Sequence, residues 1–417
     1  MKTTLLKRYV TVIVVYSMAL TVGFATNNVD VFKERGGIPN VSAKLKQGKP
    51  VTVVCFGGSI TAMDGWRNKT DKWLRGKYPE SDIKMINAGL GGTGSELGVF
   101  RMDSDVLKYN PDLIFVEFAV NDNGAADKNP ELIQRTMEGI VRKIWKHNPY
   151  TDIVFFYTVH KVMVEKYEAG KVPESVAIME RIAGYYGIPS INGGYAAYLQ
   201  GRQGKLNVPG LPWGKETPRF AKDDCHPLPY GHQLYADYIA GALTTMLEAD
   251  SAPQAHKLPE PLRNDCYETA KMLAPSKVLH LTGNWTKSDL KQFAGRMPDL
   301  LTTSEPGAAA TIVFKGSDIL FFDVIGPDTG QYSVTIDGKD AGTRVRFDKY
   351  CTYYRMHWQS VASGLDPEKK HKVTITVLPD PPVAKRNKEM ISKGTAIYVG
   401  GVMLLGEPVD EKADIQK

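Results

Sequence analysis

The chain has 417 residues, of which 42% are hydrophobic and 24% are charged. This is the composition of a folded globular protein, so it excludes a disordered chain, and the length allows two or three domains. The formal net charge of +6 at pH 7 is small for this length, and it gives no support for nucleic-acid binding.

The first 25 residues have the pattern of a secretory signal peptide. A basic start (MKTTLLKR) precedes an apolar run that ends in the small residues Gly23 and Ala25, which suit a cleavage site. The alternative is an N-terminal membrane anchor, because the run is nearly long enough to span a bilayer. Cleavage removes three basic residues and no acid, which lowers the net charge to +3. We therefore expect export to the periplasm or cell exterior if the source is bacterial, without stable membrane insertion.

Between Val51 and Glu248 the predicted strands alternate with predicted helices. Apolar, β-branched runs predict buried strands at 51–56, 82–89, 112–120, 152–159 and 188–192. Capping residues and breakers predict helices at about 130–147, 173–186 and 226–248, and a glycine- and proline-rich loop at 193–222. This alternation predicts an α/β domain over residues 26–250, with a central, mostly parallel sheet covered by helices on both faces.

The C-terminal part of the chain has a different pattern. Residues 251–265 contain three prolines and have the composition of an extended linker. Short β-type runs follow at 310–316, 318–326, 331–338, 372–379 and 396–406, and Asp337-Gly338 is a hairpin signal. This spacing predicts an all-β sandwich over residues 266–410.

The four cysteines give no sign of a metal site. They are Cys55, Cys225, Cys266 and Cys351, and their wide spacing forms no ligand pair of the kind that binds zinc. Three disulfide pairings remain open, as do four isolated thiols. We expect no cofactor and no metal, and the oligomeric state is not determined by the sequence.

Polar or glycine residues follow several predicted strands of the α/β domain, and they raise the question of function. The segment FGGSIT places Ser59 after the first strand, and Gly92 and Asn121 follow the second and third. Asp223 and His226, three residues apart, precede the last helix. Ligands of open α/β sheets bind beyond the carboxyl ends of the strands, so these side chains are expected to meet there.

This inventory is what an acyl-transfer enzyme needs. A serine becomes nucleophilic when a histidine takes its proton, and a carboxylate orients that histidine. Backbone N–H groups and an asparagine amide stabilise the oxyanion. The alternatives are structural: Ser59 as a helix cap, an ordinary turn at Asn121, and a chance Asp-x-x-His spacing.

The segments FGGSIT, NAGLGGTGS, VEFAVND and DDCHPLPYGH resemble, in order, the four sequence blocks of the SGNH (GDSL-type) hydrolases. The resemblance covers roughly residues 49–248 and implies a flavodoxin-like αβα fold with esterase activity. It implies that Ser59 is the nucleophile, His226 the base and Asp223 its orienting acid, with Asp224 as a competitor for that last role. The Ser59 amide, Gly92 and Asn121 would form the oxyanion hole. Two departures from the family pattern are Gly-Gly-Ser-Ile in the first block, familiar among the family's carbohydrate esterases, and Ala119 in place of a glycine.

Three features favour a carbohydrate substrate within this family. Export is expected, a β-sandwich is a common shape of carbohydrate-binding modules, and aromatic and basic residues flank the predicted site. Those residues are Trp66, Arg67, Trp213 and Arg219. We therefore predict an O-deacetylase of plant-type polysaccharides or oligosaccharides. The alternatives are a general short-chain or lysophospholipid esterase, a non-catalytic glycan-binding protein, Trp66 packed in the core, and a sandwich that only supports the first domain.

Overall fold

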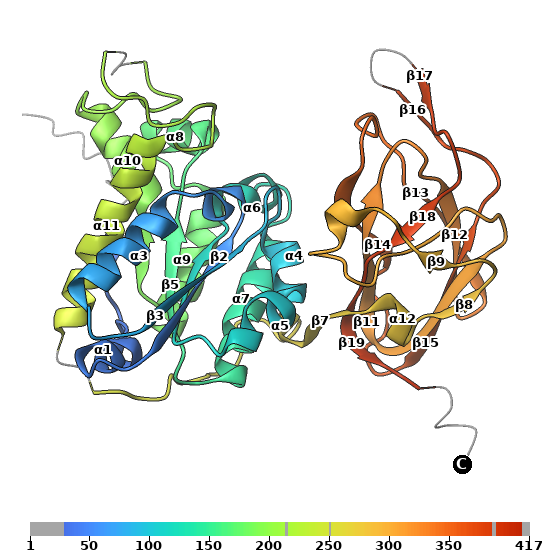
Figure 1. The fold of residues 1–417 in the computed structure, drawn as a ribbon, viewed down its shortest axis with the longest axis horizontal. Coiled ribbons are helices and arrows are strands. Elements are labelled where there is room, and N and C mark those ends of the chain that lie inside the picture. The colour runs from blue at the N-terminus through green and yellow to red at the C-terminus, as the bar shows by residue number, and fades with distance from the viewer. Residues whose placement is uncertain (1–28, 213–215, 250–251, 386–388, 411–417) are drawn as a thin grey trace, which may run out of the picture.

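The computed structural model describes residues 29–212, 216–249, 252–385 and 389–410. The predicted signal peptide and Trp213 lie outside the described residues. Figure 1 shows an α/β unit at the left and a β unit at the right, joined through the yellow segment near β7 (Ala270–Leu273). Within the described part of the chain, no helix has the length and apolar character needed to cross a membrane.

The α/β unit is built on a six-stranded sheet with the order β1-β6-β5-β4-β2-β3. Every neighbouring pair is parallel except β1 and β6. The central strand β2 lies between β3 and β4, so the strand order reverses beside it, and a doubly wound sheet binds its ligands at such a point. The strands are β1 (Phe32–Lys33), β2 (Val51–Gly57), β3 (Ile83–Gly89), β4 (Leu113–Glu117), β5 (Asp152–Tyr157) and β6 (Ser190–Asn192).

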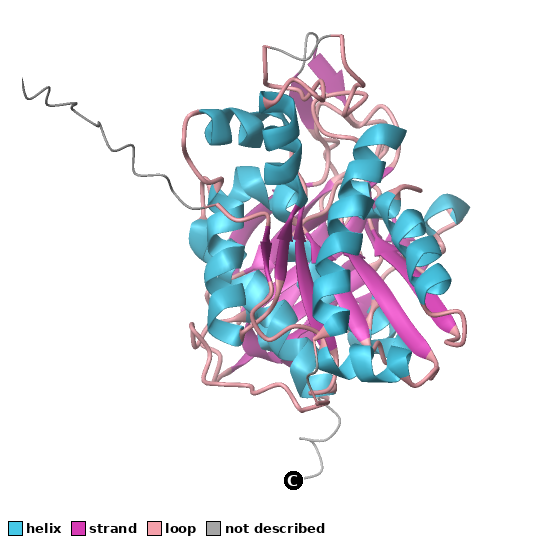
Figure 2. Cartoon of the chain, turned by 90° about the vertical axis from the view of Figure 1, so that its left-hand side faces the viewer, coloured by secondary structure: helices cyan, strands magenta, loops and turns pink. Residues whose placement is uncertain are grey.

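Helices pack on both faces of this sheet, as Figure 2 shows. One layer contains α1 (Pro39–Lys46), α3 (Trp66–Lys77) and α11 (Pro229–Glu248), and α10 (Gly193–Arg202) packs against α11. The other layer contains α4 (Ser95–Phe100), α6 (Ala119–Ala126), α7 (Pro130–His147) and α9 (Glu174–Tyr186). Shorter helices are α2 (Ser59–Ala62), α5 (Met102–Asp105), η1 (Leu107–Tyr109) and α8 (Lys161–Glu168). The predicted flavodoxin-like αβα arrangement is confirmed.

Three predicted boundaries were wrong. The loop expected at 193–222 begins with helix α10, because the Asn192 side chain caps it by accepting a hydrogen bond of 2.9 Å from the Tyr195 N–H. The third strand ends at Glu117, and the chain enters α6 at Ala119. The last helix begins at Pro229, so His226 lies in the loop before it.

The strand pairs of the described β unit are antiparallel, and the unit is centred on the 17-residue strand β11 (Ala309–Ile325). Its first half pairs with β15 and its second half with β14, so both strands belong to the same eight-stranded sheet. The runs predicted at 310–316 and 318–326 are therefore one strand, whose pairing with β19 shifts register between Gly316 and Asp318. Asp337 and Gly338 both have positive φ in a tight hairpin, as predicted.

The remaining elements of the β unit are short. They are η2 (Tyr267–Thr269), β7 (Ala270–Leu273), α12 (Pro275–Val278), β8 (His280–Thr282), β9 (Thr286–Lys287), η3 (Lys291–Phe293), β10 (Leu301–Thr303), β12 (Gln331–Ile336), β13 (Lys339–Val345), β14 (Arg355–Ala362), β15 (Lys370–Val377), β16 (Val383–Lys385), β17 (Glu389–Ile391), β18 (Ile397–Val399) and β19 (Gly401–Pro408). All four cysteines of the chain are free thiols. The predicted all-β sandwich is confirmed.

The segment expected to be a linker lies bonded along the α/β unit. The His256 ring stacks on Trp145 with centroids 4.8 Å apart, and its Nε2 lies 2.8 Å from Asp152 Oδ1. Further along, the Arg142 guanidinium donates to the Pro259 carbonyl at 2.6 Å. The segment is therefore fixed at several points, and it does not act as a free tether.

One hydrophobic cluster continues from the α/β unit into the sandwich. It contains Phe100 of α4 together with Phe322, Val324 and Met403 of strands β11 and β19. The ring of Tyr267, in the connecting segment, packs edge-on against Phe100 with centroids 5.9 Å apart. Part of the outer face of the sandwich sheet is thus buried against helices of the other unit.

Polar contacts of the sandwich reach the edge of the parallel sheet. The Arg296 guanidinium donates at 3.1 Å to the carbonyl of Gly89, the last residue of β3, and at 3.1 Å to Asp105. Trp358 of β14 hydrogen-bonds Glu96, in the first turn of α4, and this bond opposes the rise that burial causes in the Glu96 pKa. The second unit therefore contacts residues that flank the loop after β3.

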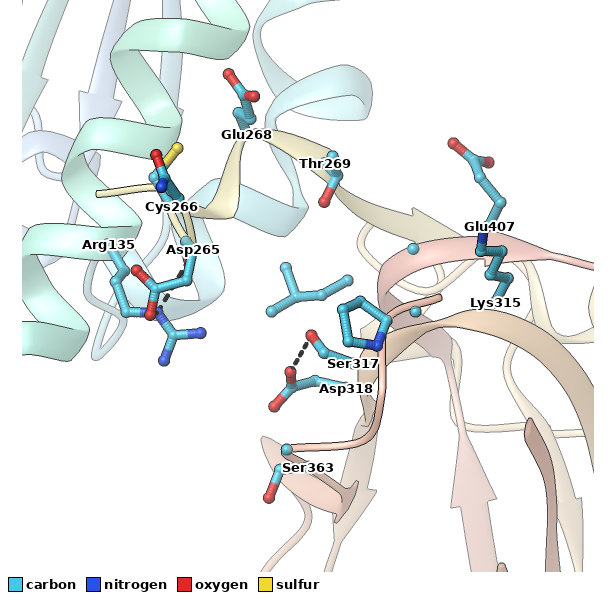
Figure 3. Close-up of a pocket in the computed structure, with 16 residues that line it drawn as sticks. Arg135, Asp265, Cys266, Glu268, Thr269, Lys315, Ser317, Asp318, Ser363 and Glu407 are labelled. Carbon is cyan, nitrogen blue, oxygen red and sulfur yellow. Dashed lines mark hydrogen bonds and ion pairs between the residues drawn. The ribbon is translucent and has the colours of Figure 1, made fainter. Parts of the chain in front are cut away.

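The two units do not touch everywhere. A cavity of about 760 Å³ lies between them, with Arg135 and Asp265 on one side and Ser317 and Asp318 on the other (Figure 3). None of the residues that line this cavity is one of the site residues predicted from the sequence. The cavity is therefore separate from the candidate site.

Candidate active site

The two glycines that precede Ser59 are explained by the close approach of neighbouring residues. A Cβ atom placed on Gly57 would lie 2.5 Å from the Glu117 carbonyl oxygen, and one placed on Gly58 would lie 2.0 Å from Asn121 Oδ1. Gly58 has φ −88°, so positive φ is not the reason for glycine at this position. The two glycines allow β4 and α6 to pack directly against the turn that presents Ser59.

Ser59, His226 and Asp223 form a continuous chain of hydrogen bonds. Ser59 Oγ lies 2.9 Å from His226 Nε2, and His226 Nδ1 lies 2.9 Å from Asp223 Oδ2. With the Nδ1 proton donated to the carboxylate, the Nε2 lone pair faces the serine hydroxyl. Ser59 and His226 are partly buried, while Asp223 is exposed. The structure therefore brings these three predicted residues together in the order that a serine hydrolase requires.

The local turn around Asp223 explains how it can orient the histidine. Its Oδ1 accepts backbone hydrogen bonds from His226 N at 2.7 Å and Cys225 N at 2.9 Å, in an Asx-type turn. These bonds, together with the imidazole, hold the pKa of Asp223 well below its usual range. Asp224 instead offers its backbone carbonyl to Lys161 N at 2.8 Å. Asp223 and His226 are thus brought together by a turn that precedes α11, and they do not lie on one face of a helix.

Gly92 and Asn121 lie in the segments that follow strands β3 and β4. Gly92 has φ +73° in the loop between β3 and α4, a conformation that favours glycine. In the same loop, a Cβ on Gly91 would lie 3.8 Å from Ser59 Cβ. Asn121, in the first turn of α6, places its side-chain amide against Gly58. The segments that follow β3 and β4 therefore both approach the turn that carries Ser59.

Comparison with known protein families agrees with this geometry. Residues 55–234 match the GDSL-like lipase/acylhydrolase family. This part of the chain is therefore similar to that family, and the chain is a carboxylic ester hydrolase. The matched range includes Ser59, Gly92, Asn121, Asp223 and His226.

Solved structures extend the likeness of this GDSL-like hydrolase to the second unit. The chain is similar to a two-domain esterase (CEX) active on acetylated mannans, co-crystallised with mannopentaose: identity is 22%, the TM-score is 0.70, and 91% of this chain and 97% of that one are covered. A structure of the CEX esterase without that ligand gives 21% identity, a TM-score of 0.70, and coverages of 90% and 98%. At these identities the likeness establishes the two-part fold. A comparison with curated proteins finds no match.

One of the residues predicted to flank the site is buried in the core. Trp66 is completely buried, and its ring packs against Phe115 and Phe156 of the sheet, with centroids 5.8 and 5.0 Å away. The prediction that Trp66 lies at the mouth of the site was therefore wrong. Arg67 keeps 11% of its side chain exposed and pairs with Asp64.

Arg219 is the remaining predicted contact within the described residues. It is exposed in the loop that leads to Asp223, and its guanidinium donates to the Lys222 carbonyl at 2.9 Å. Trp213, in the same loop, lies outside the described residues. Contact of Arg67, Trp213 or Arg219 with substrate stays a prediction.

Two buried carboxyl groups beside the site were not predicted from the sequence. Glu117 ends β4, and Asp122 follows Asn121; each is at most 2% exposed. Burial raises the pKa of each group to about 7. Asp122 Oδ1 accepts from the Ser95 N–H at 2.8 Å and so joins α6 to the start of α4. A signal for Glu117 was present, since an acid inside the apolar run DLIFVEFAV is unusual for a buried strand.

Proposed function

We propose that this chain is an exported esterase that removes O-acetyl groups from carbohydrates through an acyl-enzyme formed on Ser59. The observation that carries the proposal is the hydrogen-bond chain from Ser59 through His226 to Asp223, at the point where the strand order reverses. The likeness in both units to an esterase active on acetylated mannans supports an acetylated glycan as substrate. Export is inferred from the N-terminal sequence alone.

The proposed mechanism has two half-reactions. His226 Nε2 takes the Ser59 proton as Oγ attacks the ester carbonyl, and the imidazolium then protonates the leaving sugar oxygen, which departs as a hydroxyl. Water attacks the acetyl-enzyme with His226 again as base, and this step releases acetate and restores Ser59. Asp223 stabilises the imidazolium and keeps its orientation. The Ser59 and Gly92 amides and the Asn121 side chain are the proposed donors to the oxyanion.

Loss of the Asn121 amide should slow the chemical step more than it weakens binding. We expect Asn121→Ala to lower kcat by roughly 10²- to 10³-fold with little change in KM, because an oxyanion donor acts mainly in the transition state. Steady-state kinetics with 4-nitrophenyl acetate measure both constants. A rise in KM at unchanged kcat would make Asn121 a substrate contact instead.

The two neighbouring aspartates provide a matched pair for the orienting acid. We expect Asp223→Asn to lower kcat on the order of 10³-fold, because an amide cannot stabilise the imidazolium and favours the wrong tautomer. Asp224→Asn should stay close to the parent enzyme, since no hydrogen bond joins its side chain to His226. The assignment fails if Asp224→Asn proves the more damaging change in the same kinetic assay.

Substrate class is tested by acetate release from a panel of polymers. The panel should hold acetylated mannan, acetylated xylan and a fully deacetylated control, with 4-nitrophenyl acetate and a lysophospholipid as small esters. Acetate release from a polymer with little hydrolysis of the long acyl ester supports the proposal. Preference for the lysophospholipid would favour a lipid esterase. Absence of turnover on every ester, with retained binding of glycan, would favour a binding protein.

A further inference from the structure

Glu117 is buried, and its side chain contacts the short helix that carries Ser59. Its side chain is 1% exposed, and Oε2 accepts a hydrogen bond of 2.8 Å from Thr61 Oγ1, on the same four-residue helix as Ser59. Oε1 accepts one of 2.5 Å from Thr158 Oγ1, just beyond β5. The Glu117 carbonyl accepts from Gly58 N at 3.3 Å. One residue thus joins three neighbouring strand ends.

We infer that Glu117 is a positioning residue that fixes Ser59 Oγ within reach of His226, an inference that rests on the proposed role of Ser59. The helix α2 has four residues, and a helix this short has little stability of its own. The hydrogen bond from Thr61 to Glu117 ties this helix to the end of β4. Loss of that bond frees α2 to shift, and a displacement of about 1 Å at a nucleophile can cost roughly 10²-fold in rate.

The shape and bonding of Glu117 matter to this role more than its charge. Burial raises its pKa to about 7, and Asp122 is the charged neighbour that adds to the rise. The ionised carboxylate accepts from both threonine hydroxyls, while the neutral acid accepts from one and donates to the other. Two hydrogen bonds therefore persist in either protonation state, and glutamine, which also accepts one and donates one, can reproduce them.

The test compares Glu117→Gln with Glu117→Met in the full-length chain. We expect Glu117→Met, which keeps the length of the side chain but removes both hydrogen bonds, to lower kcat for 4-nitrophenyl acetate by about 10²-fold with KM within about twofold. The rate at which an organophosphonate labels Ser59 should fall in parallel. Glu117→Gln should restore most of the activity and keep kcat within about fivefold of the parent.

Two threonine variants separate positioning from general loss of stability. Thr158→Val removes one partner of Glu117, while Thr151→Val removes a buried hydroxyl that donates to the Pro111 carbonyl at 2.7 Å, at the other end of β5. Both should lower Tm to a similar extent, but only Thr158→Val should lower kcat and the labelling rate. This pair keeps the inference testable if Glu117→Met does not fold.

Several outcomes would overturn the inference. They are an unchanged kcat in Glu117→Met, a Glu117→Gln variant as slow as Glu117→Met, and equal losses of kcat in the two threonine variants. Each of these can occur while Ser59→Ala is inactive, and they then refute the role of Glu117 alone. An active Ser59→Ala variant would instead refute the proposed function.

Discussion

Ser59→Ala is expected to abolish ester hydrolysis while leaving the fold intact. Ser59 is the first residue of α2 and is partly exposed, so the loss of its hydroxyl opens no core cavity. The covalent route depends on this oxygen, and we expect kcat to fall on the order of 10⁴-fold or more. Turnover of 4-nitrophenyl acetate measures the loss of activity, and thermal unfolding checks that the fold is intact.

Covalent labelling identifies the nucleophile independently of turnover. An organophosphonate should label the parent chain and fail to label Ser59→Ala. His226→Ala should lose a similar factor in kcat, because the serine then has no base. Ser104→Ala is a matched control, since this exposed serine donates to the Arg101 carbonyl and the Asp105 side chain, away from His226. A label that persists on Ser59→Ala would show that another residue is the nucleophile.

The proposed site could be predicted because acyl transfer through a serine restricts which residue types can occupy each strand end. A nucleophilic turn needs small residues beside it, and Gly57 and Gly58 are explained by the approach of Glu117 and Asn121. The buried strands were also visible, since parallel strands covered on both faces read as continuous apolar runs. What the sequence could not supply was the geometry that makes Asp223 rather than Asp224 the partner of His226, which depends on the path of the turn.

The errors have identifiable physical causes. Trp66 was placed at the site because it follows the nucleophile closely, but Trp66, Thr70 and Leu74 recur at helical spacing and form the buried face of α3. That period was the signal that could have placed it in the core. Helix α10 was missed because a Gly-Gly start reads as a loop, although the side chain of Asn192 provides a cap.

The position of the sandwich was the least predictable feature. Docking depends on side chains from segments far apart in the chain, such as Phe100 and Phe322, which share one hydrophobic cluster. Strand β14 was missed for a related reason. Its sequence, RMHWQSVA, alternates weakly, because one of its faces meets the α/β unit and the other includes His357, which bonds the buried Arg346. Local pattern cannot show which surface a second domain will cover.

Removal of the sandwich should therefore destroy the hydrolase as a soluble enzyme, even though every proposed catalytic residue precedes it. A chain that ends at Ala249 loses Tyr267, whose backbone packs so closely on α7 that a Cβ at Gly139 would lie 2.7 Å from it. It also exposes Phe100, at present covered by Tyr267 and the sandwich. Exposed apolar surface of this kind promotes aggregation, and we expect soluble yield to fall about tenfold or more.

A second fragment shows which part of the lost structure matters. A chain that ends at Asp265 keeps His256 stacked on Trp145 and the bond from Arg142 to Pro259, but it still lacks the sandwich. We expect it to aggregate as well, because the helices α4 and α7 remain uncovered.

Coexpression of residues 252–417 with the fragment ending at Ala249 should recover part of the soluble yield, since the contacts need no covalent link. Soluble yield and turnover of 4-nitrophenyl acetate are the measurements. A fragment ending at Ala249 that is soluble and fully active would show that the sandwich is an independent module, and its effect would then be confined to polymeric substrates.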